Sequence, residues 1–132
     1  MKRFINKIDD NLPEGDYFTQ ARPPYVAQFI TPDIANSVLR EGVSAAGDPL
    51  WADSGFDTVA EYAHWAPRLC GIACLKMCLE AYNRSLDESL AVVARNTLNI
   101  GGYISKNDVG WRYSSLVKVA KNCYGLKKRI NF

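Results

Sequence analysis

An almost wholly apolar run from Ile72 to Tyr82 constrains the fold of this chain more than any other feature of its sequence. Apolar residues recur at helical spacing along one stripe, and four more widen it: Ile72, Leu75, Leu79 and Tyr82, then Cys74, Met77, Cys78 and Ala81. Only Lys76, Glu80 and Asn83 mark a solvated strip. A helix that is apolar nearly all round lies inside a fold, so we expect a central helix that is buried on most sides.

The rest of the chain predicts a helix-rich α+β protein with few short strands. Residues 1–24 are polar and rich in turn formers and read as an N-terminal arm, while residues 25–132 form one domain. Expected strands are a short one at 25–30 and a beginning one from 126 onward. Expected helices run from about 32 to 41, 58 to 65, 85 to 98 and 116 to 124. Their expected caps are Thr31, Thr58, Ser85, and Ser114 or Ser115.

The charges of the chain are nearly balanced. Sixteen basic and fourteen acidic residues give a net charge of +2, and they are scattered except at 127–129. This balance predicts no nucleic-acid groove and no membrane-surface face. The basic start of the chain is followed by Asp9 and Asp10 rather than by an apolar stretch, so we expect no signal peptide and a cytoplasmic protein.

Three of the four cysteines lie four residues apart on the central helix, at Cys70, Cys74 and Cys78. Side chains on adjacent turns do not easily form a disulfide, so reduced thiols are expected, with only Cys123 able to approach from another element. Three sulfurs over this length of helix spread too far for one ion, and zinc sites use tighter spacings. We therefore expect no metal or cofactor, and interpret Cys74 and Cys78 as core filling.

Cys70 stands apart because a helix is expected to begin there. Backbone N–H groups of a first helical turn favour negative charge, hence a thiolate. Gly71 would let an incoming carbonyl approach the backbone, and the Cys70 N–H would donate to an oxyanion. The alternative is that Cys70 is a small buried apolar residue. The only histidine, His64, precedes Cys70, and a tight corner at Pro67 would bring the two together.

A resemblance accompanies this pattern. The run Cys70-Gly71-Ile72-Ala73-Cys74-Leu75-Lys76-Met77 resembles the nucleophile helix of papain-like cysteine peptidases of the bacteriocin-leader-processing type, Cys-Gly-x-Ala-x-Leu-x-Met. The segment Pro24-Tyr25-Val26-Ala27-Gln28 is similar to the strand that carries their oxyanion-hole glutamine. Further segments resemble a bacterial branch of the group: Asp48-Pro49-Leu50-Trp51, Ser54-Gly55-Phe56, Glu61-Tyr62 and Trp65. The likeness spans about residues 24–126.

The resemblance implies the helix-rich N-terminal half of a papain-like fold. It implies Cys70 as nucleophile and Gln28 as oxyanion-stabilising amide, with His64 as an alternative donor because compact members place the glutamine six residues before the cysteine. The family takes its base from a histidine downstream of the nucleophile helix, but no histidine follows Cys70 here. Asn107 and Asp108 do not substitute, since an amide accepts no proton and a carboxylate disfavours a thiolate.

Two functions therefore remain open. The first is a papain-like cysteine peptidase acting on a peptide or protein substrate, with the catalytic sheet and its histidine missing because the chain is truncated or because a partner chain supplies them. The second is a catalytically silent module that binds a peptide or protein. Gly71, Trp51 and Trp111 are the expected substrate contacts of the peptidase, and Trp51 and Trp111 those of the silent module; the alternative is that these tryptophans are core or cap residues.

Overall fold

The computed structural model describes residues 23–83 and 87–125. Two antiparallel strands, β1 (Tyr103–Ile104) and β2 (Gly110–Trp111), pair Tyr103 with Trp111 and form a small sheet. The α-helices are α2 (Ala35–Leu39), α3 (Val59–Trp65), α4 (Cys70–Asn83), α5 (Leu90–Leu98) and α6 (Tyr113–Asn122). Short 3-10 turns are η1 (Pro32–Ile34), η2 (Ala45–Gly47), η3 (Trp51–Ser54), η4 (Ala66–Arg68) and η5 (Lys106–Asp108). The expected helix-rich α+β class is confirmed.

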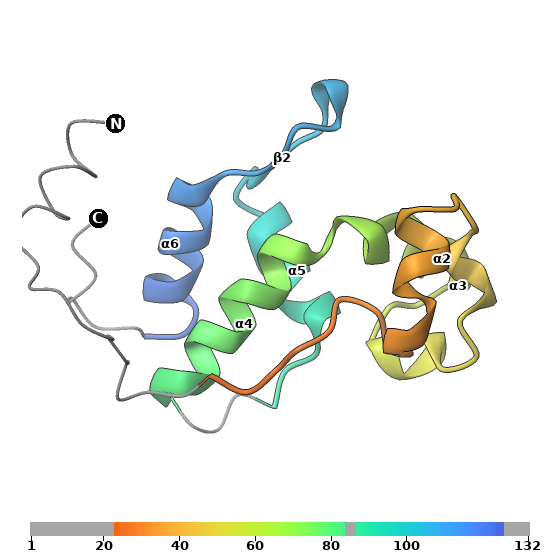
Figure 1. Cartoon of the computed structure of the whole chain (residues 1–132). Helices are drawn as coiled ribbons and strands as arrows, with labels where there is room; N and C mark the ends of the chain where they lie inside the picture. The colour runs from red at the N-terminus through yellow and green to blue at the C-terminus, as the bar shows by residue number, and fades with distance from the viewer. Residues whose placement is uncertain (1–22, 84–86, 126–132) are drawn as a thin grey trace, which may run out of the picture.

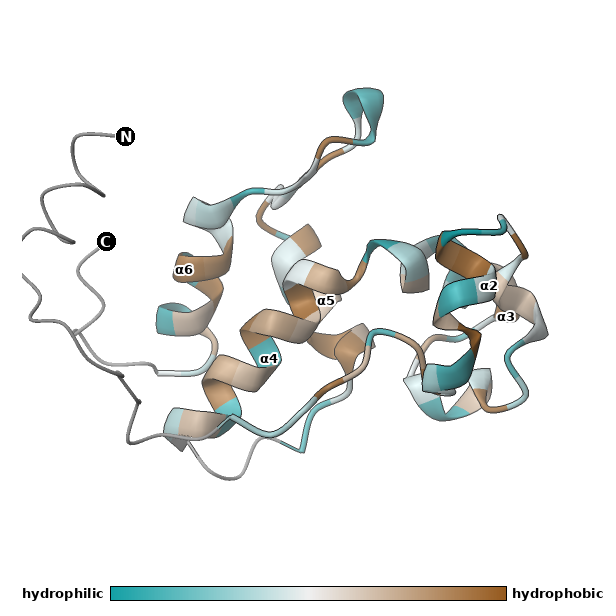
Figure 2. Cartoon of the chain, in the orientation of Figure 1, coloured by the Kyte–Doolittle hydropathy of each residue, from teal (hydrophilic) through white to brown (hydrophobic). Residues whose placement is uncertain are grey.

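Helix α4 runs through the middle of the fold (Figure 1). Helices α5 and α6 contact it and each other, and α3 with η2 forms a second group beside α2. The largest fully buried apolar side chains come from both groups: Phe29, Tyr62, Leu69, Ile72, Leu79, Val93 and Val119. Figure 2 shows the apolar residues gathered along α4 and the elements next to it. No helix in the described ranges has the length and apolar character needed to span a bilayer.

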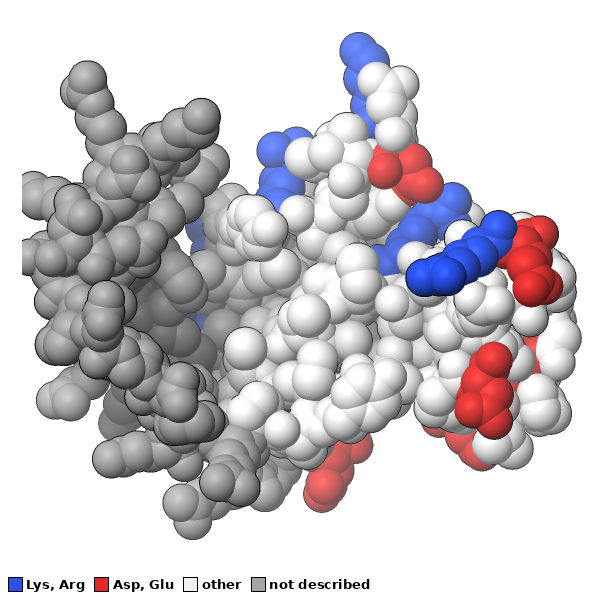
Figure 3. All heavy atoms as spheres, viewed as in Figure 1, with Lys and Arg blue, Asp and Glu red and all other residues white. Residues whose placement is uncertain are grey.

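The exposed side of α4 is not the one the sequence predicts. Helix α4 buries Ile72, Ala73, Leu75 and Leu79, whereas Cys70, Cys74 and Cys78 are exposed and Tyr82 is 62% exposed. The interpretation of Cys74 and Cys78 as core filling, and of Tyr82 as part of the buried stripe, is therefore wrong. The surface over α4 in Figure 3 is uncharged.

The two long charged side chains of α4 lie on the more covered side. Lys76 and Glu80 are only 14% and 20% exposed, and the Lys76 ammonium lies 2.7 Å from a Glu80 carboxylate oxygen. Their partial burial is tolerated because the two charges pair one helical turn apart. The expected solvated strip is thus half-buried, and the sulfur-bearing side takes its place at the surface.

Several expected element boundaries are corrected. The run at 25–30 forms no strand. The Thr31 side chain caps no helix, and its hydroxyl donates to Asp48. Helix α5 begins at Leu90 after Ser89, whose hydroxyl accepts from the Val92 N–H at 3.3 Å. The predicted cap Ser85 lies outside the described residues, as do most of the N-terminal arm and the strand expected from 126.

Helix α6 begins three residues earlier than its expected start. It starts at Tyr113, and Arg112 stands at the N-cap position without a side-chain hydrogen bond, so neither Ser114 nor Ser115 caps it. Ser115 is instead buried beside Gly102. Helix α2, by contrast, ends close to the expected stop, because Gly42 follows with a φ of +72° that favours glycine.

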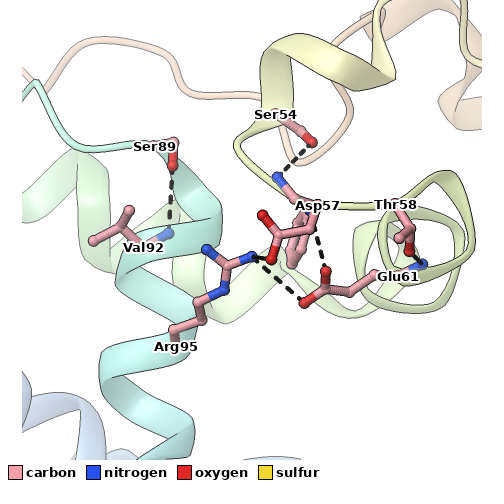
Figure 4. A network of polar contacts seen from close by, with 8 residues as sticks. Ser54, Asp57, Thr58, Glu61, Ser89, Val92 and Arg95 are labelled. Atoms are coloured by element: carbon pink, nitrogen blue, oxygen red, sulfur yellow. Dashed lines mark hydrogen bonds and ion pairs between the residues drawn. The ribbon is translucent and has the colours of Figure 1, made fainter.

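The expected start of α3 is confirmed and ties α3 to α5 (Figure 4). The Thr58 hydroxyl accepts from the Glu61 N–H at 3.1 Å, and the Glu61 carboxylate accepts from the Asp57 N–H at 3.2 Å. The Arg95 guanidinium of α5 then lies 3.2 Å from the Asp57 carboxylate and 3.6 Å from that of Glu61. The acidic start of α3 is thereby joined to the last turn of α5.

Candidate active site around Cys70

Cys70 is the first residue of α4 and is exposed to solvent. Helix α3 ends at Trp65, and Pro67 sits in the single turn η4, so the chain changes direction before α4 begins. Leu69, which is 1% exposed, anchors the corner in the core. Its carbonyl accepts from the Ala73 N–H at 2.7 Å, which starts the helical ladder. This arrangement confirms the expected placement of Cys70 at a helix start and excludes the buried-residue interpretation.

A pocket of about 210 Å³ lies beside this helix start. Figure 1 shows the segment before η1 running alongside α4, and the pocket lies between them. Its lining comes from two sides: Tyr25, Val26, Ala27, Gln28, Phe29, Pro32 and Ala35, and across from them Cys70, Ala73, Cys74 and Met77. None of these residues is charged, so the pocket is an apolar recess with thiol groups and one amide in its wall.

Gln28 shares this pocket with Cys70 and is fixed to the same corner of the chain. Its side-chain Nε2 donates to the Ala66 carbonyl at 2.9 Å. Ala66 belongs to η4, directly before α4, so the amide is held next to the start of α4. A glutamine amide carries two N–H donors, and this bond uses one of them. The structure therefore brings together the two residues that the resemblance pairs.

A buried carboxylate holds the segment that carries Gln28. Asp48 is 1% exposed and accepts from the Thr31 N–H at 3.1 Å, the Thr31 hydroxyl at 2.5 Å, the Leu50 N–H at 2.9 Å and the Tyr62 hydroxyl at 2.6 Å. The Tyr62 hydroxyl in turn accepts from the Ile30 N–H at 3.1 Å. We call Asp48, Thr31 and Tyr62 the carboxylate clamp. The sequence marks Asp48 and Tyr62 only as motif residues, because nothing in it signals a buried acid.

The clamp also shifts two pKa values in opposite directions. Burial alone would raise the pKa of Asp48, but the hydrogen bonds from Thr31, Tyr62 and Leu50 outweigh it and hold that pKa below its ordinary 3.8. Burial, with the neighbouring Asp48 carboxylate, raises the pKa of Tyr62. Asp48 is therefore an ionised acceptor and Tyr62 a neutral donor at neutral pH.

Gly71 and Trp111 touch each other next to Cys70. The Trp111 indole N–H of β2 donates to the Arg68 carbonyl at 2.7 Å. A Cβ added at Gly71 would lie 3.1 Å from Trp111 Cδ1, so the glycine gives the indole room against the first turn of α4. Trp65 and Tyr103 pack on the same indole, with ring centroids 5.7 and 4.9 Å away. Gly71 and Trp111 therefore pack together at the helix start, and neither lines the pocket.

The remaining predicted site residues lie away from the pocket lining. His64 is exposed at the end of α3, its ring edge-on to Trp65 at 4.9 Å, and no hydrogen bond joins it to Cys70 within the described ranges. Trp51 is half-buried in η3 against the core. The sequence excludes Asp108 as a base. Its carboxylate lies 3.0 Å from the Arg68 guanidinium and accepts a hydrogen bond from the Tyr103 hydroxyl. The hydrogen bond from Arg68 is the main cause that lowers the pKa of Asp108, and the bond from Tyr103 is the second.

The described residues offer no conventional metal cluster, since no three His, Cys, Asp or Glu side chains among them are placed to hold one ion. No known protein family, curated protein or solved structure matches the chain. The features of the site that bear on function are an exposed thiol at a helix start, an anchored amide and an apolar recess between them.

Proposed function

We propose that this protein is papain-like in its helical part and that Cys70 is its thiol nucleophile, acting on a carbonyl of a peptide or protein substrate. The observation that carries the proposal is the shared pocket of Cys70 and Gln28, two residues far apart in the sequence. Four free, exposed thiols are stable only in a reducing compartment, which supports a cytoplasmic location.

The chemistry would follow from these two residues and a base. The Cys70 thiolate attacks the carbonyl carbon, and the carbonyl electron pair moves to oxygen. The Cys70 N–H, which has no intrahelical partner in a first turn, and the second N–H of the Gln28 amide stabilise this oxyanion. The amine then leaves with a proton from the base, and water hydrolyses the thioester to a carboxylate and the free thiol. His64 stands outside the pocket lining, so we propose that a partner chain supplies the base.

A second function is favoured by one observation. The pocket lining contains no His, Asp, Glu or Lys, so the recess is suited to holding an apolar peptide segment without cleaving it. In this catalytically inactive module Gln28 would donate to a peptide carbonyl, and Cys70 would be an ordinary thiol. The two functions differ in whether Cys70 reacts.

Thiol labelling of the full chain separates them, because α4 contains its own control. Cys70 and Cys78 are both exposed on one helix, but only Cys70 lies in the first turn and in the pocket. With a small uncharged alkylating reagent near neutral pH, we expect Cys70 to react about tenfold or more faster than Cys78, measured by peptide mapping. Equal rates at the two positions would refute the nucleophile.

An acyl-transfer assay tests the remaining step. With an activated peptide ester, which needs no protonated leaving group, we expect a covalent acyl adduct on Cys70, detected by intact mass and absent in Cys70→Ser. Gln28→Glu removes the donor at nearly constant size and should slow acylation about 100-fold, whereas Gln20→Glu serves as the matched substitution outside the described residues. Peptide binding without any adduct would establish the inactive module.

A further inference from the structure

The exposed side of α4 carries more sulfur than one nucleophile requires. Cys70, Cys74 and Met77 all line the same pocket, so three sulfur-bearing residues border one apolar recess. Cys78 is exposed on the same helix but does not line the pocket. The three pocket sulfurs are therefore a distinct group, which we call the sulfur trio.

Helix geometry brings the members of the sulfur trio within reach of one another. Residues four apart on a helix have Cβ atoms about 5–6 Å apart, and their side chains lean toward the N-terminus of the helix. Cys70 and Cys74 have this spacing, and Met77 follows Cys74 by three residues. Long side chains on a helix commonly project toward the preceding turn, and for Met77 that turn holds Cys74.

The donor set selects the ion. Zinc in structural sites takes four ligands, and the described residues place no three His, Cys, Asp or Glu side chains around one ion. Thiolates and thioethers are soft ligands that favour Cu(I), which is satisfied by two thiolates with or without a weak third donor. The uncharged lining adds no hard oxygen ligand from an acidic side chain.

We propose that Cys70 and Cys74 bind one Cu(I) ion at the edge of this pocket, with Met77 as a weaker third ligand. Two S–Cu bonds form, both thiol protons pass to solvent, and copper remains in the +1 state throughout. The resulting site has one negative charge, which the first-turn N–H groups of α4 stabilise. The ion would occupy the Cys70 sulfur, so bound copper and thiol reactivity exclude each other. The site does not depend on peptidase activity.

The test is an anaerobic titration of the reduced full chain with Cu(I) in competition with a chromophoric Cu(I) chelator. We expect one tightly bound ion per chain and an ultraviolet thiolate-to-copper band. Cys74→Ser should weaken binding about 100-fold or more and Met77→Leu about tenfold, while Cys78→Ser and Cys123→Ser leave it unchanged. The exchanged side chains at Cys74, Cys78 and Cys123 are exposed, so circular dichroism should show folded variants.

Two outcomes would overturn the proposal. The first is that the chelator retains the copper at all protein concentrations. The second is that Cys78→Ser weakens binding as much as Cys74→Ser, which would indicate scattered thiol binding. A protection experiment gives an independent readout: one equivalent of Cu(I) should block alkylation of Cys70 and Cys74 but not of Cys78. The labelling rate of Cys70 in metal-free protein tests the nucleophile proposal separately. Failure of copper binding can therefore be told apart from failure of the nucleophile proposal.

Discussion

The carboxylate clamp makes the most quantitative prediction. Asp48 is buried and accepts from two backbone N–H groups and two hydroxyls, and these bonds hold the segment that carries Gln28 against α3. Asp48→Asn keeps the size of the side chain but removes its charge and turns one acceptor oxygen into an NH₂ group. That group would face donors that can no longer be satisfied.

The hydrogen bonds that Asp48 accepts set the size of the expected loss in the free energy of unfolding. Bonds to a charged group contribute about 1.5–3 kcal/mol each, and an unsatisfied buried donor costs about 1–3 kcal/mol. Because an asparagine oxygen can still accept part of the set, we expect Asp48→Asn to lower the free energy of unfolding by about 3 kcal/mol. Tyr62→Phe removes a donor to Asp48 and the acceptor of the Ile30 N–H, so about 2 kcal/mol is expected. The double variant should lose less than the sum, because both changes remove the same bond.

Urea unfolding followed by tryptophan fluorescence measures these losses, with Asp53→Asn, at an exposed residue, as the control expected to change stability by less than about 0.5 kcal/mol. The pH profile adds a second readout. The folded pKa of Asp48 lies below 3.8, so its contribution is present above that pH and is lost as the pH falls through the folded value. Asp48→Asn should lack this acid-sensitive part. An unchanged urea midpoint and acid profile would refute the clamp.

Two glycine substitutions give further predictions, both read as urea midpoints. Gly71→Ala should cost about 1 kcal/mol, because its Cβ would lie 3.1 Å from the hydrogen-bonded indole of Trp111, and a stabilised variant would show that the indole moves freely. Gly102→Ala should cost about 3 kcal/mol, because its Cβ would lie 2.4 Å from Thr97 Cγ2 and 2.7 Å from the Thr97 carbonyl oxygen. Gly47→Ala, with no atom within 4 Å of the added Cβ, is its control, and equal midpoints for these two variants would contradict the packing at Gly102.

Local sequence signals predicted the helix boundaries best where a motif is compatible with only one local structure. Thr58 and Glu61 form a cap and its reciprocal acid, and α3 begins there; Gly42 stops α2 through its positive φ. Residues that are common to several kinds of local structure, such as serines in caps and turns, predicted the boundaries less well. Ser89 rather than Ser85 caps the described start of α5, and α6 begins at Tyr113, before the expected cap Ser114. The strand-like run at 25–30 pairs with no strand in the part of the chain that the structure describes, so it stays irregular and is held by side-chain bonds instead.

Of the residues that the sequence proposes for a site, Cys70 and Gln28 line one pocket, whereas His64, Gly71, Trp51 and Trp111 do not line it. A helix start at Cys70 follows from Pro67 and the apolar run behind it, and the structure places Gln28 at the same pocket. Asp48 could not be identified from sequence, because an isolated acid beside a proline is usually an exposed turn residue. Its burial depends on donors from three segments, Thr31, Leu50 and Tyr62, and only the tertiary fold assembles them.

The face of α4 that the sequence assigned wrongly is also the face on which both proposals for this helix depend. Hydropathy ranks cysteine above lysine and glutamate, so periodicity places the thiols inside and Lys76 with Glu80 outside. In the structure that charged pair is half-buried, while Cys70, Cys74 and Cys78 are exposed. A helix with only a structural role would gain stability by burying these apolar side chains, and exposing them gives up that stabilisation. Both proposals for α4, thiol attack and copper binding, require this exposure, and buried cysteines could perform neither.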